Sequence, residues 1–475
     1  MNIRTTTTAA NQIELAQAVL PEIERLSRRE MIGRLGGGVG TLGLVSMLGQ
    51  QASQASTLAP HYAPKAKRII QLFMNGGPFQ ADLFDPKPAL KKYAGQRPKG
   101  ADLRTERVTG GLMPSPYKFA HYGQSGIEVS ELLPHFAQCV DDICVVRSAH
   151  SDNPNHNPAL FLINNGTIAP TSPSMGSWLS YGLGTENEDL PGYIVMCPGQ
   201  PVEFPLLWSS AFLPRKYQGT FINHSSLEPR KLVPYLRNAN LDRPTQRRQL
   251  DLLRRLNEEH LSTSGRDDAL TARIEAMETA FRMQFEASEA FDLSREPQSV
   301  RERYGDTHFS NGCLLARRLA ERGVRITQIY YGDGQPWDTH DNHDKRVRQL
   351  CADVDKPMAA LLTDLKERGL LEDTLVIWGG EFGRTPVSEN GDGRDHNHWG
   401  FTMWMAGGGI RPGLTYGATD EFGFSAVDNK VHIHDLHATI LHLLGLDHEK
   451  LTYRYAGRDF RLTDVYGRIV HDIVA

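Results

Sequence analysis

Histidines and carboxylates gather in three short segments of the carboxyl-terminal third of the chain. The segments are residues 337–343, 379–384 and 394–398. Imidazole and carboxylate groups are the side chains that bind Zn²⁺ or Mn²⁺ in proteins. Each segment lies beside a strongly apolar stretch, and α/β proteins build their sites at strand ends. The pattern therefore predicts a metal site and the chemistry of metal-assisted hydrolysis.

Three of these side chains are the first candidates for one shared ion, namely Asp338, His340 and His396. The alternative for each is a solvated polar loop. Glu381 follows an apolar run and two glycines, so it is either a further ligand or the partner of Arg384. The planar guanidinium of Arg384 is suited to holding an anionic ester oxygen by two hydrogen bonds.

A fourth polar segment, residues 151–159, follows another apolar run. A hydroxyl at a strand-to-helix turn is where an activated nucleophile would be placed, which makes Ser151 a candidate. Ordinary capping of a helix by serine or aspartate is the competing interpretation. His156 in the same segment could steady the anion. Four histidines between 432 and 442 fit packing and hydrogen bonding inside a helix better than they fit a ligand set.

The elements that would position these residues can be read from the apolar runs. Helical patterns at 311–322 and 358–368 each end in a glycine, as helices commonly do. Helices that alternate with buried strands predict an α/β fold, with a doubly wound, mainly parallel sheet and helices on both faces. Residues 240–300 carry dense Arg, Glu and Leu and predict a helical insertion or cap. The expected strands are 68–74, 142–147, 324–331, 374–378 and 401–406.

The amino-terminal segment is interpreted as a targeting signal. Arg28 and Arg29 precede a short glycine-rich apolar run, and small residues follow at 53–55. This order is typical of a twin-arginine signal peptide, although a helix inside the fold is the alternative. We therefore expect residues 1–56 to be a leader and linker, and 57–475 to be one domain. The expected location is periplasmic or extracellular, with the twin-arginine translocase as a partner during export and no membrane span in the mature chain.

Composition narrows the remaining classes. The chain has 475 residues and a formal net charge of −4, so it lacks the basic surplus of a nucleic-acid-binding protein and no such partner is expected. Its five cysteines form no Cys-x-x-Cys pair, which argues against a thiolate zinc site. Buried free thiols are favoured over a disulfide between Cys139 and Cys144.

Several longer segments, together with the twin arginine, carry a family resemblance. They are NGGPFQADLFDPKP (75–88), SDNPNHNPAL (151–160), PSMGSWLSYGLG (173–184), GGEFGRTP (379–386), GRDHNHWGFTMWMAGGG (393–409) and VHIHDLHATILHLLGLD (431–447). With these motifs the chain resembles an exported bacterial family of unknown function that is placed in the alkaline phosphatase and sulfatase superfamily. The resemblance covers essentially all of residues 65–475. It implies an alkaline phosphatase-like fold, two metal sites that share a nucleophile, and ester hydrolysis.

Carried over by position, the resemblance implies roles for individual residues. Ser151 matches the nucleophile, and His396 matches a late histidine ligand. Asp338 and His340 match the Asp/His pair of one metal site. Asn75 lies where a first aspartate ligand is usual.

Two positions depart from the superfamily pattern. Asn75 is neutral where a charged ligand is usual, and Phe382 stands after Glu381 where a second ligand is usual, so the second metal site is weakened unless Glu381 and Asp82 rebuild it. The chain also has no Cys-x-Pro-x-Arg motif near the nucleophile position, which argues against a formylglycine sulfatase.

Two hypotheses follow. The first is an exported metal-dependent hydrolase of phosphate or sulfate esters, which acts on a small-molecule or glycan ester. It would use one or two divalent ions, with Zn, Mn and Ca as the candidates. The second is a catalytically inactive superfamily member that binds sulfated or phosphorylated glycans.

Overall fold

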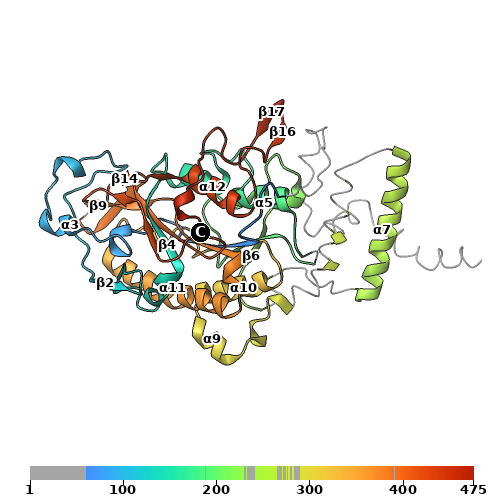
Figure 1. Ribbon diagram of the computed structural model, residues 1–475. Coiled ribbons are helices and arrows are strands. Elements are labelled where there is room, and N and C mark those ends of the chain that lie inside the picture. The colour runs from blue at the N-terminus through green and yellow to red at the C-terminus, as the bar shows by residue number, and fades with distance from the viewer. Residues whose placement is uncertain are drawn as a thin grey trace, which may run out of the picture. The chain divides into compact units, whose positions relative to one another are not determined.

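The computed structural model describes residues 60–187, 189–228, 232, 241–264, 270, 274, 277, 278, 281, 282, 289–389 and 391–475 (Figure 1). The predicted leader, residues 1–56, lies outside the described residues. So does part of the predicted helical insertion.

A nine-stranded sheet forms the centre of the described chain, in the order β12-β4-β11-β8-β1-β7-β5-β6, with β15 paired to β4. Short polar breaks separate its apolar segments, as expected for strands buried on both faces. The strands are β1 (Arg68–Phe73), β4 (Ile143–His150), β5 (Tyr193–Cys197), β6 (Thr220–Asn223), β7 (Ile326–Tyr330), β8 (Thr374–Gly379), β11 (Phe401–Ala406), β12 (Leu414–Tyr416) and β15 (Val431–His432).

The sheet is mainly parallel. β1 pairs with β7 and β8 in parallel, and β5 pairs with β6 and β7 in the same sense. β11 is the exception, because it runs antiparallel to both β4 and β8. The amino end of β11 therefore lies at the same edge of the sheet as the carboxyl ends of its neighbours.

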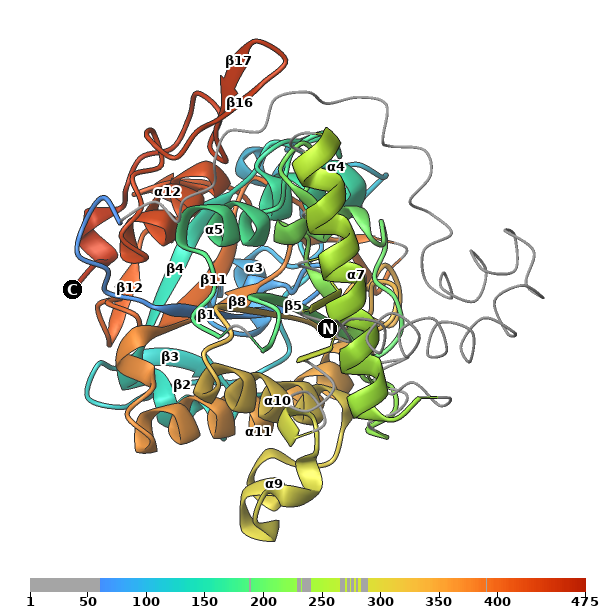
Figure 2. The ribbon, with the colours of Figure 1, turned by 90° about the vertical axis from the view of Figure 1, so that its right-hand side faces the viewer.

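Helices cover both faces of this sheet (Figure 2). Ile70 and Leu72 of β1 belong to the core that contains α10 (His308–Glu321) and α11 (His343–Glu367). Ile69 and Phe73, on the opposite face of the same strand, pack in the core of α4, α5 and α12. Alternate residues of a strand point to opposite faces, so β1 is apolar throughout because both faces are buried. The bounds of the three last helices are α4 (His156–Asn165), α5 (Met175–Leu183) and α12 (Ile433–Leu443).

Smaller elements surround the main sheet. The remaining strands form two-stranded sheets: β2 (Phe119–Tyr122) with β3 (Ile127–Ser130), β9 (Gly383–Glu389) with β10 (Gly393–Asn397), β13 (Ala418–Thr419) with β14 (Ala426–Asp428), and β16 (Tyr453–Tyr455) with β17 (Arg458–Phe460). The other α-helices are α3 (Pro88–Lys92), α7 (Arg243–Ser264) and α9 (Gln298–Tyr304). The 3-10 helices are η1 (Gln80–Asp82), η2 (Lys99–Ala101), η3 (Phe136–Asp142), η4 (Leu206–Trp208), η5 (Arg215–Tyr217), η6 (Leu293–Arg295), η7 (Leu371–Asp373) and η8 (His471–Ile473).

The predicted α/β architecture is confirmed, and each predicted strand is present within a few residues of its expected bounds. One helix is longer than predicted. The pattern placed its start at residue 358, directly after Pro357, but α11 begins at His343 and runs through that proline. Buried Val347, Leu350 and Val354 continue the apolar stripe on the other side of Pro357, and packing of that stripe outweighs the proline's effect on the helix.

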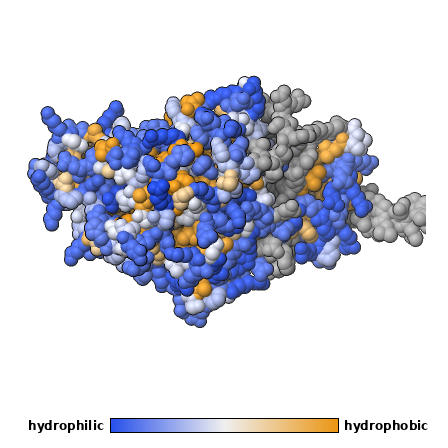
Figure 3. Space-filling model, viewed as in Figure 1, coloured by the Kyte–Doolittle hydropathy of each residue, from blue (hydrophilic) through white to orange (hydrophobic). Residues whose placement is uncertain are grey.

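The surface and the helices were also compared with what a membrane-spanning chain requires. The face shown in Figure 3 is largely hydrophilic, with apolar residues in small patches. Among the helices of the described residues, none combines the length and the hydrophobicity needed to cross a bilayer.

Candidate metal centre

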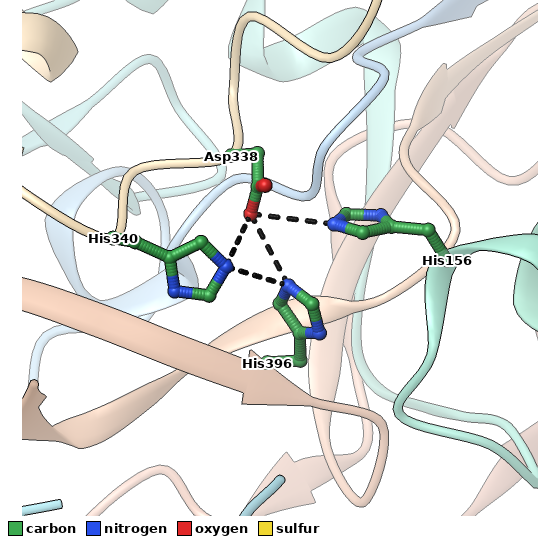
Figure 4. Close-up of side chains that lie close together, drawn as sticks. All are labelled: His156, Asp338, His340 and His396. Carbon is green, nitrogen blue, oxygen red and sulfur yellow. Dashed lines mark hydrogen bonds and ion pairs between the residues drawn. The ribbon is translucent and has the colours of Figure 1, made fainter. Parts of the chain in front are cut away.

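Four side chains that are far apart in the sequence meet at one point (Figure 4). They are His156, Asp338, His340 and His396. The Oδ1 atom of Asp338 lies 2.9 Å from Nε2 of His340, 3.2 Å from Nε2 of His396 and 3.3 Å from Nε2 of His156. The Nε2 atoms of His340 and His396 are 3.0 Å apart. All four side chains thus turn one ligand atom toward a common centre.

The sheet explains how these residues meet. Asp338 and His340 lie in the loop that follows β7, and His156 begins α4, which follows β4. His396 belongs to β10, just before β11. Because β11 is antiparallel, a residue before it and residues after parallel strands come to the same edge. This edge of the sheet is the one at which the predicted polar clusters were expected to converge.

Two glycines allow the loops to approach one another. A Cβ atom on Gly393 would lie 1.8 Å from the backbone oxygen of His340. Gly76 has φ of +113°, and a Cβ atom there would lie 2.3 Å from the backbone nitrogen of Asp338. Any larger residue at either position would push a ligand-bearing loop away, so glycine is required for close approach and, at residue 76, for the backbone conformation as well.

A glutamate stands behind each imidazole. Nδ1 of His156 donates to Glu381 at 2.7 Å. Nδ1 of His340 donates to Glu389, and Nδ1 of His396 donates to Glu106, both at 2.5 Å. Such carboxylate partners fix the orientation and the tautomer of a metal-binding histidine. In a neutral ring with Nδ1 protonated, Nε2 carries a free lone pair.

The arrangement consequently places hydrogen-bond acceptor atoms next to one another without a donor between them. Three Nε2 lone pairs and one carboxylate oxygen lie about as close together as hydrogen-bonded atoms, yet neutral rings of this tautomer offer no proton between them. A cation placed among the four atoms removes this repulsion. These four atoms could therefore hold a cation together.

The ionisation of the cluster supports this interpretation. Burial opposes the charged form of Asp338, but the three neighbouring imidazoles and the charge of Arg384 outweigh it and hold the pKa of Asp338 far below its ordinary value. Burial also opposes protonation of His156, but Asp338 and Glu381 outweigh it and raise the pKa of His156. Burial, with the charges of Arg384 and His156, lowers the pKa of His396 to about 3.

The four residues fit a transition-metal ion. Ligand atoms held about 2.1 Å from one ion in a tetrahedral arrangement lie about 3.4 Å apart, close to the spacings around Asp338 Oδ1. Three imidazole nitrogens and one carboxylate oxygen suit Zn, Fe or Mn, whereas Ca²⁺ is bound by oxygen ligands. Of the candidate ions inferred from the sequence, Ca²⁺ is the one that this donor set disfavours.

Three residues with predicted roles lie around the four ligands instead of among them. Glu381 is fully buried, bonded to His156 and to the backbone nitrogen of Gly76, which places it behind an imidazole. Arg384 is also fully buried, and it donates to Asp338 at 2.5 Å and to backbone carbonyls. Its contacts therefore hold a ligand in place, and no guanidinium edge is left facing an incoming anion. The side-chain amide of Asn75 donates to the backbone oxygens of residues 332 and 334, so it braces a turn.

The predicted nucleophile is not joined to the cluster. The backbone nitrogen of Ser151 donates to His398, and its buried Oγ has no hydrogen-bond partner among the described residues. It is His156, five residues later, that reaches Asp338. Asp82, proposed to help rebuild a second metal site, instead bonds His343 at 2.8 Å.

Sequence reasoning missed the role of some residues. His156 was expected near an anion, but its contacts place it with the ligand atoms. Glu106 and Glu389 were not singled out, because each lies in a segment without a local motif. Metal-binding histidines usually donate to a carboxylate, so a glutamate or aspartate was to be expected behind each candidate histidine. The sequence does not show which of its carboxylates lie close to these histidines in space.

Comparison with family models identifies residues 66–474 with the family described as "Protein of unknown function (DUF1501)", and the chain belongs to that family. No curated protein matches the chain.

The chain is also similar to solved structures. A phosphonate monoester hydrolase from Silicibacter pomeroyi is 13% identical with a TM-score of 0.35, covering 72% of this chain and 71% of its own. The PsFucS1 sulfatase from a Pseudoalteromonas species is 12% identical with a TM-score of 0.33, covering 80% and 68%. The lipoteichoic acid synthase LtaP from Listeria monocytogenes is 9% identical with a TM-score of 0.36, covering 85% and 76%. Similarity at this level leaves the activity of this chain to be argued from its own residues.

Replacing Gly393 with alanine is expected to weaken metal binding, because the added Cβ would displace the His340 backbone. We expect loss of at least tenfold in Zn²⁺ affinity, measured by competition with a chromophoric chelator, and destabilisation of roughly 1–3 kcal/mol. Gly391→Ala is the matched control. Residue 391 has φ of +95° but open space around it, so this variant should lose roughly 1–2 kcal/mol of stability and keep its Zn²⁺ affinity. Equal affinities in both variants would contradict the role of Gly393.

Replacing Glu381 with glutamine removes the charge that orients His156. We expect Zn²⁺ affinity to fall by about 10- to 100-fold, as for other carboxylates behind ligand histidines. Glu296→Gln is the control, since Glu296 is also buried but is paired with Arg317 and Arg318. It should lower the melting temperature while the Zn²⁺ dissociation constant stays at the wild-type value.

Proposed function

We propose that this member of the family is an exported hydrolase of phosphate or sulfate esters that works with one bound transition-metal ion. The observation that carries the proposal is the convergence of three imidazole Nε2 atoms and one carboxylate oxygen at the edge of the sheet. Asp338 and His340 are partly exposed, with 22% and 15% of their side chains accessible, so the cluster is in contact with solvent. The ester class rests on the superfamily resemblance of the sequence motifs.

The residues of the chain have distinct tasks in this proposal. His156, His340, His396 and Asp338 hold the ion, and the glutamates behind the imidazoles keep each Nε2 lone pair directed inward. Arg384 holds the Asp338 carboxylate in its ionised form. A bound ion supplies Lewis acidity toward an ester oxygen or a water molecule.

Two observations favour a single ion. The ring of Phe382 packs against His396, with ring centroids 4.7 Å apart, and against His156 at 4.8 Å. An apolar ring thus occupies the position where a second ligand would be expected. The amide of Asn75 is engaged with the backbone of a neighbouring turn.

A water molecule is the proposed nucleophile in place of Ser151. Among the described residues, no serine, threonine or cysteine side chain is hydrogen bonded to any of the four ligand side chains. Ser151 has no base within hydrogen-bonding distance of its Oγ, which an activated serine requires.

The second candidate function is a binding protein for sulfated or phosphorylated glycans. It is favoured by the same features that reduce the site to one ion, because two-ion catalysis needs both ions to stabilise the entering and leaving oxygens. Export by the twin-arginine pathway to the periplasm or the cell exterior is proposed for either function. It rests on Arg28 and Arg29, which lie outside the described residues.

The decisive variant is His340→Ala. It should lose bound metal and turnover together, since it removes a ligand, whereas Ser151→Ala should retain both. The measurements are elemental analysis and hydrolysis of aryl phosphate, aryl phosphodiester and aryl sulfate with Zn²⁺, Mn²⁺ or Ca²⁺. His437→Ala is the control, because this histidine is buried, bonds the backbone of Ile163 and is hydrogen bonded to none of the four side chains of the cluster.

Hydrolysis by a metal-free preparation would contradict the proposal. So would loss of turnover in Ser151→Ala with metal content intact, which would restore the serine nucleophile. Stoichiometric metal without turnover of any ester would favour the binding protein.

A further inference from the structure

A chain of buried polar side chains runs behind the loop that carries two of the ligands. The hydroxyl of Thr339 donates to Nδ1 of His343 at 2.6 Å. Nε2 of His343 then donates to Asp82 at 2.8 Å. The exposed fractions of Thr339, His343 and Asp82 are 1%, 2% and 0%. We call these three residues the buried relay.

Thr339 stands between Asp338 and His340 in the sequence. The side chains of Asp338 and His340 meet each other at 2.9 Å in the metal centre, whereas Thr339 turns away from them to His343. Because Thr339 is joined by peptide bonds to Asp338 and His340, a change in its backbone torsion angles would move both ligand side chains. The hydrogen bond between Thr339 and His343 therefore constrains the positions of both Asp338 and His340.

The relay also reaches the segment of the third ligand. The backbone nitrogen of Arg394 donates to the backbone oxygen of Thr339 at 3.1 Å, and Arg394 is two residues before His396. The guanidinium of Arg394 lies 3.8 Å from the centre of the Phe79 ring, one residue before η1, which contains Asp82. Burial would raise the pKa of Asp82, but His343 and Arg394 outweigh it and lower that pKa. A buried carboxylate with a compensating charge can persist in the core.

Hydroxyl, imidazole and carboxylate in a row is also the composition of a nucleophilic triad. Its burial excludes that role here, because no substrate can reach a hydroxyl that is 1% exposed and is directed into the core. The relay must act through the groups that it holds.

We infer that the buried relay is a positioning device, which sets the conformation of residues 338–340 and thereby the affinity and coordination geometry of the metal centre. The inference rests on the proposed function in that Asp338 and His340 are taken to be ligands. Its three side chains bond one another, and none of them is hydrogen bonded to a ligand side chain. Their effect is exerted through the ligand loop alone.

The experiment compares Thr339→Val, which keeps the shape but loses the hydroxyl, with Thr339→Ser, which keeps the hydroxyl. Asp82→Asn tests the other end of the relay. We expect Thr339→Val and Asp82→Asn to bind Zn²⁺ about tenfold or more weakly by chelator competition, and Thr339→Ser to remain near wild type. The visible absorption spectrum of the Co²⁺-substituted protein should shift in the first two variants, since it reports the coordination geometry.

Asp364→Asn provides the matched control. Asp364 is 3% exposed and bonds Arg317, Arg368 and Tyr304, none of which contacts the metal centre. It should lower the melting temperature as Asp82→Asn does, but leave Zn²⁺ affinity and the Co²⁺ spectrum unchanged. A purely structural role for the relay predicts that the two variants behave alike, and that result would overturn the inference.

The outcomes separate this inference from the proposed function. If wild-type protein binds Zn²⁺ and Thr339→Val binds it equally well with the same Co²⁺ spectrum, the relay is overturned while the metal centre stands. If wild-type protein binds no ion, the proposed function fails. Crystal structures of metal-free wild type and Thr339→Val then test whether the buried relay sets the conformation of residues 338–340. Preservation of the 2.9 Å contact between Asp338 and His340 in that variant would overturn it, and loss of the contact would support it.

Discussion

The arrangement of the candidate metal centre depends on one electrostatic constraint. Three imidazoles are each bound by a carboxylate at Nδ1, so their Nε2 lone pairs all face the anionic oxygen of Asp338. Acceptors held at about 3 Å repel one another unless a cation lies among them. A proton on His156 can relieve the repulsion in part, and a divalent ion relieves it for all four atoms.

The fold holds the ligands against this repulsion. Parallel strands deliver the loops after β4 and β7 to one edge of the sheet, and antiparallel β11 brings β10 to the same edge. Gly76 and Gly393 then let the backbones approach more closely than any side chain would allow. Arg384 from one side and Thr339 from the other fix the Asp338 loop. The packing of the sheet and its loops therefore determines where the ligand atoms lie.

Two residues beside the cluster are engaged in packing and backbone contacts. Phe382 covers both His156 and His396, and the amide of Asn75 is satisfied by backbone. Both positions were identified as departures in the sequence. The structure adds that the Phe382 ring packs against two histidines of the cluster and that the Asn75 amide bonds backbone oxygens.

The sequence by itself determined the α/β class, the strands and the loops that carry Asp338, His340 and His396, because apolar periodicity and polar breaks are local properties of the chain. It also showed that residues 75 and 382 depart from a two-ion pattern. Only the tertiary structure showed that His156 lies with Asp338, His340 and His396, and that the hydroxyl of Ser151 bonds none of them. The same holds for Glu106, Glu381 and Glu389, which each stand behind one histidine, and for Asp82, which bonds His343. The reason is physical: a ligand set is defined by distances between side chains that are up to 240 residues apart in the sequence, and those distances exist only after the sheet and its helices have packed.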